Sequence, residues 1–575
     1  MNHLARKATP VLVTFVLLLS APADAASRKA KDLLQYIPAD TPYVVAYTKP
    51  LPDDLQDKFE PAMDQTLAAY RRLLRLALDA EVEKAATEES DDGQAEQVRA
   101  FMEEFLDLMS VDGLRAAGLG RGALFAVYGD GLLPVIRLGV TSIRELEATV
   151  ERIESRAPEK FATGSIDGKT YRYADIDKMR LVIATFGKDA VITFVPQGYS
   201  EERLAGTLGL NKPRRSLARS KELRKVAKEY DLEDYLVGYI DVERVAASFT
   251  GDPSGLNSEL LEIMGHDAST MTPQCRAEFA EMAAIAPRIV MGYTRVDEDY
   301  IDSRMVVELR DDIATGLATL PAVIPGLGLD AGGLMSFGFS LDPLALRNFY
   351  EARLDAVEVD PFECATFAEL QKGTVKGREV LAKPVPPVVY SFRGFLARVM
   401  DIQGMDIASE KPPESVDASL LFSVENAEAL VTMAALMSPE IAALNLLPDG
   451  KARALDFPQI KEVAEQAFAA LSEGGLSLSL GADAERQAEA MLEAKVDKSR
   501  PFMSFAMDAQ RYYEFVGEAM MEGKPKEGEE PMPEEMRAAL RDAMISSGAL
   551  YERMLVNVHL TERGIEVGSR ITLTD

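Results

Sequence analysis

An internal duplication constrains the fold of this 575-residue chain more than any other feature. Residues 36–309 resemble residues 333–573 in the order of their apolar and polar segments, and the two copies match best at their ends. Residues 288–309 alternate apolar and polar positions on both sides of an acidic turn, and residues 553–573 do the same around Glu562–Gly564. This pattern predicts that a long β-hairpin closes each copy.

A strand that ends in aspartate and leads into a helical pattern occurs three times, at Asp241, Asp342 and Asp508. An aspartate carboxylate at this position can accept the free amide hydrogens of the first helical turn. We therefore interpret the three residues as helix caps, with a catalytic role as the alternative. Two further strand-then-helix units also match between the copies, and their strands are residues 135–140 with 419–424, and 190–195 with 476–480.

The mixture of hairpins and helical segments predicts an α+β fold made of two related repeats, each a largely antiparallel sheet packed with helices. We place a signal peptide at residues 1–25, the first repeat at 26–310, a linker at 311–332 and the second repeat at 333–575. Within the linker, residues 312–320 predict a short helix that ends at Pro321.

The first 25 residues are typical of a secretory signal peptide. Arg6 and Lys7 form a basic start, residues 11–19 are largely apolar, and Ala23-Asp24-Ala25 is a small-x-small exit that predicts cleavage after Ala25. The residue directly after the predicted cleavage site is Ala26 and not cysteine, so the pattern does not favour a lipid anchor. We expect a periplasmic or secreted protein, and no later segment has the 18 uncharged apolar residues of a membrane span.

The formal net charge of −30 limits the class of partner. Such a charge repels phosphate backbones and anionic lipid surfaces, which argues against nucleic-acid binding. The charge is compatible with cationic ligands, but we interpret it as a contribution to solubility.

The only two cysteines, Cys275 and Cys364, both belong to the exported part of the chain. An even number of cysteines in an oxidising compartment favours a disulfide, and this one would link the two repeats. Two buried thiols are the alternative. A catalytic thiol would need a neighbouring base, for which His266 is the nearest candidate in sequence.

Motifs for catalysis, cofactors and metals are absent from the sequence. Gly118-Leu-Gly120-Arg-Gly122 precedes a strand and does not follow one, so we interpret it as a turn and not as a dinucleotide or phosphate loop. His266 and His559 are far apart, and the acidic groups Asp297–Asp299 and Asp91-Asp92 lack the ligand spacing of a calcium loop. We therefore predict no catalytic, cofactor-binding or metal-binding residue, and no enzymatic activity.

The chain has 24 methionines, several of them in pairs on one face of an expected element. Met433 and Met437 are one helical turn apart, as are Met532 and Met536, while Met503 and Met507 share a strand. We expect these side chains to pack in the core. A groove for a lipid or an apolar peptide is an alternative, since thioethers form adaptable apolar surfaces, and copper binding is another.

The segment from Tyr36 to Tyr47, with Ile37-Pro-Ala-Asp-Thr-Pro42 leading into a strand, resembles the opening of a family of exported bacterial proteins of unknown function. The resemblance implies a bacterial envelope location and no known activity. We therefore expect a non-catalytic binding or structural protein whose partner is an unknown envelope protein. The alternative is a carrier of an apolar ligand such as a lipid or hydrophobic peptide.

Overall fold

A computed structural model describes residues 30–87, 92–157, 160–251, 257–266, 271–404, 413–457, 460–522 and 532–574. The expected cleavage site after Ala25 and the first residue of the acidic pair, Asp91, lie outside these residues. Asp92 is the first residue of a described range. The described chain mixes helices with a large antiparallel sheet, so the predicted α+β class is confirmed.

All nineteen strands of the described residues belong to one antiparallel sheet. From one edge to the other they are β4 (Ala162–Ile166), β5 (Lys169–Ile176), β6 (Met179–Phe186), β7 (Asp189–Pro196), β3 (Leu133–Gly139), β2 (Phe125–Asp130), β1 (Tyr43–Tyr47), β8 (Leu236–Asp241), β9 (Arg288–Val296), β10 (Tyr300–Glu308), β19 (Gly564–Thr572), β18 (Arg553–Thr561), β17 (Met503–Asp508), β11 (Met335–Ser340), β12 (Phe392–Gln403), β13 (Ser415–Val424), β16 (Gly475–Leu480), β15 (Ala467–Ser472) and β14 (Ala452–Ala454).

The two halves of the chain meet edge to edge at the middle of this sheet. β10 pairs with β19 so that Tyr300 is opposite Thr572 and Glu308 is opposite Gly564. Counted outward from this pair, β9, β8, β1, β2, β3 and β7 occupy the places that β18, β17, β11, β12, β13 and β16 occupy on the other side. The predicted closing hairpins are β9–β10 and β18–β19, and they lie next to each other.

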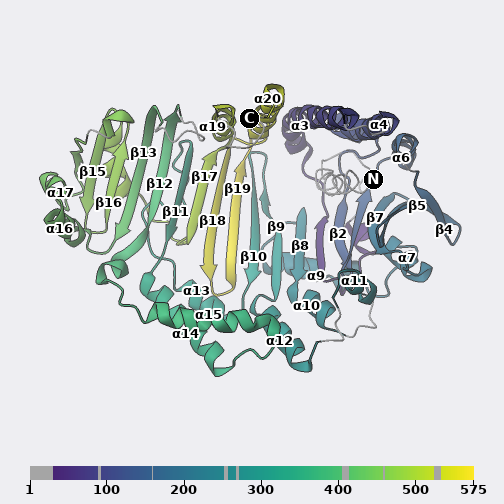
Figure 1. The fold of residues 1–575 in the computed structure, drawn as a ribbon, viewed down its shortest axis with the longest axis horizontal. Helices are drawn as coiled ribbons and strands as arrows, with labels where there is room; N and C mark the ends of the chain where they lie inside the picture. Colours follow the sequence, from purple (N-terminus) through teal and green to yellow (C-terminus); the bar gives the residue numbers. More distant parts are fainter. Residues whose placement is uncertain are drawn as a thin grey trace.

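Long helices lie in two rows along the two ends of the strands (Figure 1). One row consists of α19 (Ala509–Glu522), α20 (Glu534–Gly548), α3 (Asp53–Thr87) and α4 (Asp92–Leu108). The other consists of α15 (Ala368–Leu381), α14 (Pro343–Val359), α13 (Asp311–Ala318), α12 (Pro273–Ile285) and α10 (Val242–Thr250).

Both rows connect the first half of the chain to the second. In one row α20 packs on α3, and the Thr66 hydroxyl donates a hydrogen bond to the Ser546 carbonyl oxygen at 2.8 Å. In the other row Cys275 of α12 lies at disulfide distance from Cys364, with the sulfur atoms 2.08 Å apart. The predicted cysteine pair therefore joins the two halves.

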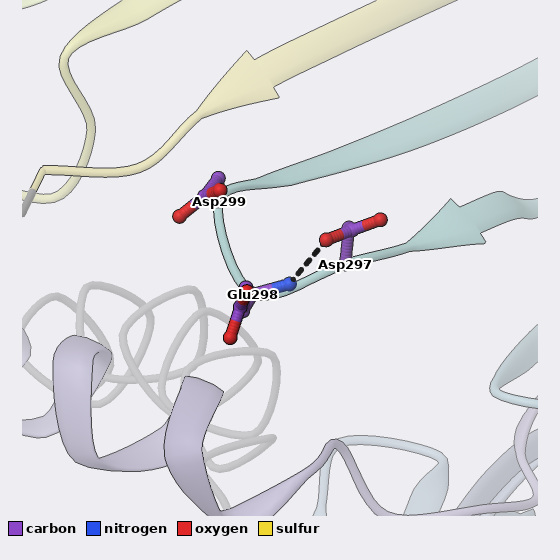
Figure 2. A group of neighbouring side chains, drawn as sticks. All are labelled: Asp297, Glu298 and Asp299. Atoms are coloured by element: carbon purple, nitrogen blue, oxygen red, sulfur yellow. Dashed lines mark hydrogen bonds between the residues drawn. The ribbon is translucent and has the colours of Figure 1, made fainter.

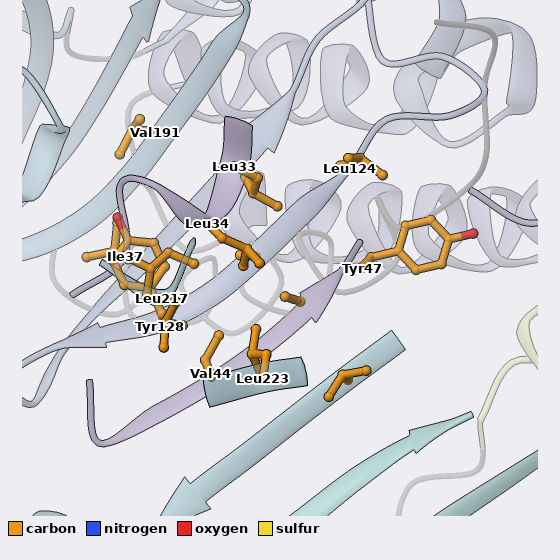
Figure 3. Packing of buried hydrophobic residues seen from close by; sticks show 14 of the residues in the cluster. Leu33, Leu34, Ile37, Val44, Tyr47, Leu124, Tyr128, Val191, Leu217 and Leu223 are labelled. Atoms are coloured by element: carbon orange, nitrogen blue, oxygen red, sulfur yellow. The ribbon is translucent and has the colours of Figure 1, made fainter. Parts of the chain in front are cut away.

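The main hydrophobic core lies on one face of the first-half strands (Figure 3). The short helices α2 (Ala30–Leu34), α7 (Glu201–Leu208), α8 (Leu217–Ser220) and α9 (Glu222–Glu229) contribute leucines such as Leu33, Leu217 and Leu223, all nearly inaccessible to solvent. They pack against Val44 of β1 and Tyr128 of β2, so this face is fully covered.

In the second half the same face of the sheet is covered by the linker and by α18 (Ala484–Glu493). Ile324 and Leu327 of the linker pack with Leu396, Leu421 and Met491. The linker turns at Gly328, whose φ is +86° and whose missing Cβ would lie 2.7 Å from the Pro501 side chain. The short linker helix that we predicted is α13.

The remaining elements complete the described chain. They are α5 (Val111–Ala116), α6 (Ile143–Arg156), α11 (Ser258–Ile263), α16 (Ala427–Met437) and α17 (Pro439–Ala443), with 3₁₀ turns η2 (Ala365–Phe367), η3 (Pro387–Ser391) and η4 (Ile460–Glu462). The glycine cluster forms the turn between α5 and β2, as predicted.

The three strand-end aspartates cap helices, as interpreted from the sequence. Asp241, Asp342 and Asp508 accept backbone amide hydrogens from the first turns of α10, α14 and α19 at 2.9–3.0 Å. Each carboxylate thus has a structural role.

We predict that Asp508→Ala lowers the free energy of unfolding by about 1 kcal/mol, because an amide of α19 loses its acceptor. Asp483→Ala is the matched control, since Asp483 holds the same position at α18 but its side chain makes no cap hydrogen bond. Urea unfolding of both variants is the measurement. Equal losses in the two variants would contradict the capping role.

Candidate functional site

The feature that distinguishes this sheet is a face of large apolar side chains across its central strands. On β10 this face carries Met305 and Val307, and on β19 it carries Val567 directly opposite Met305. We define the apolar band as the residues that continue this face across eight neighbouring strands: Ile289, Met291, Met305, Val307, Ile565, Val567, Val556, Val558, Met503, Phe505, Phe337, Phe339, Phe395, Leu420 and Phe422.

No residue of the apolar band is fully buried, although its strands lie in the middle of the sheet. Met305 is 39 % exposed and Phe422 36 %, and the other members are half-buried. An antiparallel sheet normally covers its apolar face and leaves a polar face in water. A contiguous exposed apolar surface of this kind marks an interaction site.

The opposite face of the second-half strands carries small residues, and these are buried. Ser340, Ser477 and Ser479 have no accessible surface. Their hydroxyls donate hydrogen bonds within the protein, to the Pro501 carbonyl at 2.9 Å, the Ala488 carbonyl at 2.6 Å and the Ser419 hydroxyl at 2.9 Å. The sheet therefore buries serine and exposes phenylalanine and methionine, which is the reverse of the usual arrangement.

The band face offers almost no hydrogen-bonding group. Ser303 and Ser569 lie among the band residues of β10 and β19, and their hydroxyl oxygens are 2.7 Å apart, so they satisfy each other. Each of the eight strands is paired on both sides, so the backbone groups are also engaged. The surface can bind a ligand only through apolar contact.

One end of the band is aromatic. The Phe337 and Phe339 rings meet the Phe395 ring edge-to-face, with centroids 5.8 and 4.9 Å apart, and Phe395 pairs across the strands with Phe422. At the strand spacing of about 4.8 Å, eight strands extend for roughly 34 Å. The band is therefore about as long as the hydrocarbon core of a bilayer is thick, roughly 30 Å.

At one end of the central strands, α3 partly covers the face that carries the apolar band. Leu55 and Phe59 of α3 pack on Ile301, Tyr293 and Ile571. These contacts place α3 over the band side of the sheet, so the apolar band begins where the helix cover ends.

The acidic turn Asp297–Asp299 joins β9 to β10 (Figure 2). Its oxygen atoms lie close enough together to hold a cation, but each aspartate already has a partner. Asp297 accepts hydrogen bonds from the Glu298 amide and from Arg295 at 2.8–2.9 Å, and Asp299 pairs with Lys58 at 3.2 Å. Both aspartates are thus engaged by cationic side chains, and this is the only such acidic group within the described ranges.

Two cavities lie on the covered face, opposite the band. The first, of about 200 Å³, is lined by Tyr128, Asp130, Tyr199 and Arg203 among others. Burial raises the pKa of the Asp130 carboxyl, although a hydrogen bond from Thr207 at 2.6 Å opposes the shift. The second, of about 740 Å³, lies between the linker and β13.

The two histidines of the described chain lie on different elements and have different hydrogen-bond partners. His266 contacts the Phe249 carbonyl at 3.0 Å, and Cys275 is bonded to Cys364, so the catalytic-thiol alternative is wrong. His559 lies on β18 on the face opposite the band and contacts Ser499 at 3.0 Å. Burial lowers the pKa of the His559 imidazole.

The methionine pairs do not all pack in the core, and for most of them that prediction is wrong. Met433 and Met437 are 49 % and 85 % exposed, because they lie on α16, of which only Ala427 is buried. Met532 is 42 % exposed. Met503 belongs to the band, and only Met507 of the same strand is buried.

No protein-family model matches the chain, and comparison with curated proteins and with solved structures finds no significant similarity. None of the helices in the described ranges combines the length and the apolar composition that crossing a membrane requires.

Proposed function

We propose that this protein is an exported, non-catalytic carrier that binds the acyl chains of lipids on its apolar band. The observation that carries the proposal is the exposure of Met305 and Phe422 on one face of a nineteen-stranded sheet, where the hydroxyls of Ser303 and Ser569 bond to each other. Apolar surface buried from water contributes about 25 cal/mol per Å², and a ligand without polar groups loses no hydrogen bonds when it binds there.

The chemistry of the band favours acyl chains over the other apolar ligand that the sequence left open, a hydrophobic peptide. A peptide recognised by a sheet normally adds a strand at an edge and uses main-chain hydrogen bonds. The band lies at the centre of the sheet, where both neighbours of every strand already use those groups. Flexible Met305, Met291 and Met503 side chains suit ligands of variable shape.

The length of the band suits more than one chain. One leaflet contributes about half of the roughly 30 Å hydrocarbon thickness of a bilayer. A surface of about 34 Å therefore accommodates two acyl chains end to end across the strands.

Export is part of the proposal and rests on residues 1–25 and on the resemblance of residues 36–47 to exported bacterial proteins. A periplasmic location suits a lipid carrier, because the acyl chains of lipids that move between membranes must be shielded from water. The equal strand order of the two halves supports an origin by duplication, in which the apolar faces of two copies became one band.

The test is lipid binding by the exported protein purified from its own cells. We expect native mass spectrometry to detect co-purifying lipid, and a pyrene-labelled fatty acid to bind the delipidated protein in a saturable manner. The absence of both lipid and saturable binding would overturn the proposal and favour a structural role through an envelope partner.

A further inference from the structure

One helix of the second half is apolar on every side and yet lies in solvent. α16 has only one buried residue, Ala427, and no charged residue from Ala429 to Ser438. Leu436 and Met437 are each 85 % exposed, Met433 is 49 % exposed, and Leu447, just beyond α17, is 47 % exposed. We call these four residues the apolar tip. A helix that is apolar all round normally lies in a protein core or in a membrane.

The apolar tip is close to the aromatic end of the band. α16 begins three residues after β13 ends at Val424, and Phe422 of the band lies near that end of β13. Figure 1 shows α16 and α17 at the extremity of the molecule, beside β15 and β16. A ligand that leaves the band at Phe422 would therefore meet the tip.

We infer that the apolar tip inserts into one leaflet of a lipid bilayer and that acyl chains pass there between the bilayer and the band. This inference rests on the proposed function. With 11 residues and a rise of 1.5 Å per residue, α16 is about 16 Å long, which matches one leaflet and cannot span two.

The net charge of the protein determines which kind of bilayer the tip can approach. The chain as a whole carries −30, and Glu428 and Glu440 flank the uncharged part of α16 and α17. An anionic surface would repel the protein, so the inference commits to a zwitterionic bilayer.

A protein partner fits the tip less well. Protein interfaces carry about one hydrogen bond per 100–200 Å² and a polar rim. The side chains of α16 from Ala429 to Met437 offer one hydroxyl, that of Thr432, and the Ser438 hydroxyl beyond them is already bonded to Glu440 at 2.7 Å.

The test is flotation of the full exported chain with phosphatidylcholine vesicles. We expect the wild-type protein to float, and the double variant Leu436→Glu/Met437→Glu to float at least fivefold less. The matched control is Val375→Glu, because Val375 is 62 % exposed on α15, a helix with charges of both signs, and this variant should float like the wild type. Vesicles rich in phosphatidylglycerol should recover less wild-type protein than phosphatidylcholine vesicles do.

A second readout separates this inference from the proposed function. The double variant should bind soluble pyrene-labelled fatty acid as the wild type does, but should take it up from vesicles more slowly. Saturable binding without wild-type flotation would overturn the inference alone. If the probe does not bind, the proposed function is overturned, and so is the transfer of acyl chains through the tip. If the wild-type protein is a dimer and the double variant Leu436→Glu/Met437→Glu is a monomer, the tip mediates self-association. That result would also overturn the inference.

Discussion

Met305→Glu should weaken binding of a fatty acid at least tenfold, which corresponds to about 1.4 kcal/mol. Met305 lies between Met291 and Val567, on the central strand of the sheet and near the β9 end of the apolar band. A carboxylate there must lose water when an acyl chain covers it, and no cationic group belongs to the band to compensate. Titration of the pyrene-labelled probe is the measurement.

The control for this variant is Val359→Glu, which introduces the same charge at an 86 % exposed position at the end of α14. We expect it to bind the probe like the wild type. Because Met305 is already 39 % exposed, Met305→Glu should change the free energy of unfolding by less than about 1 kcal/mol. Equal affinities for wild type and Met305→Glu would place the ligand elsewhere.

The double variant Cys275→Ser/Cys364→Ser should lose about 4–5 kcal/mol of unfolding free energy. The two cysteines are 89 residues apart in sequence, and opening a loop of that length restores much conformational freedom to the unfolded chain. The native geometry should persist, because the Glu278 carboxylate accepts the amide hydrogens of Glu363 and Cys364 at 2.8 and 3.0 Å.

Urea unfolding measures this loss, and it also tests its mechanism. If the disulfide acts on the unfolded state, the denaturant dependence of the free energy should become steeper in the double variant, because its unfolded chain exposes more surface. Reduction of the wild-type protein should reproduce the effect. A loss below about 1 kcal/mol would show that strand pairing and helix packing hold the two halves together without the disulfide.

The sequence was sufficient to predict the local structure of each half. Alternation around the turns at Asp297–Asp299 and Glu562–Gly564 predicted the closing hairpins, and the aspartates at strand ends predicted the helix starts. These features depend on residues that are near each other in the chain. The edge-to-edge pairing of β10 with β19 could not be predicted, because it joins segments more than 250 residues apart.

The apolar band could not be predicted for a different reason. Alternation in β17 separates Met503 and Phe505 from Ser504 and Ala506, but it does not tell which set is covered. Hydrophobicity alone would bury Phe505 and expose Ser504, whereas the structure buries Ser504 and leaves Phe505 half-buried. The placement of α18 and the linker on the serine face decides the matter, and that placement depends on tertiary packing.

The most direct test of the account is to locate a bound acyl chain on the protein. Delipidated protein would be loaded with a fatty acid that carries a photoactivatable diazirine, irradiated and mapped by peptide mass spectrometry. The account predicts saturable adducts on the central strands, at residues such as Met305, Val567 and Phe422. Adducts confined to the cavities of the opposite face, around Tyr199 or Val323, would contradict it.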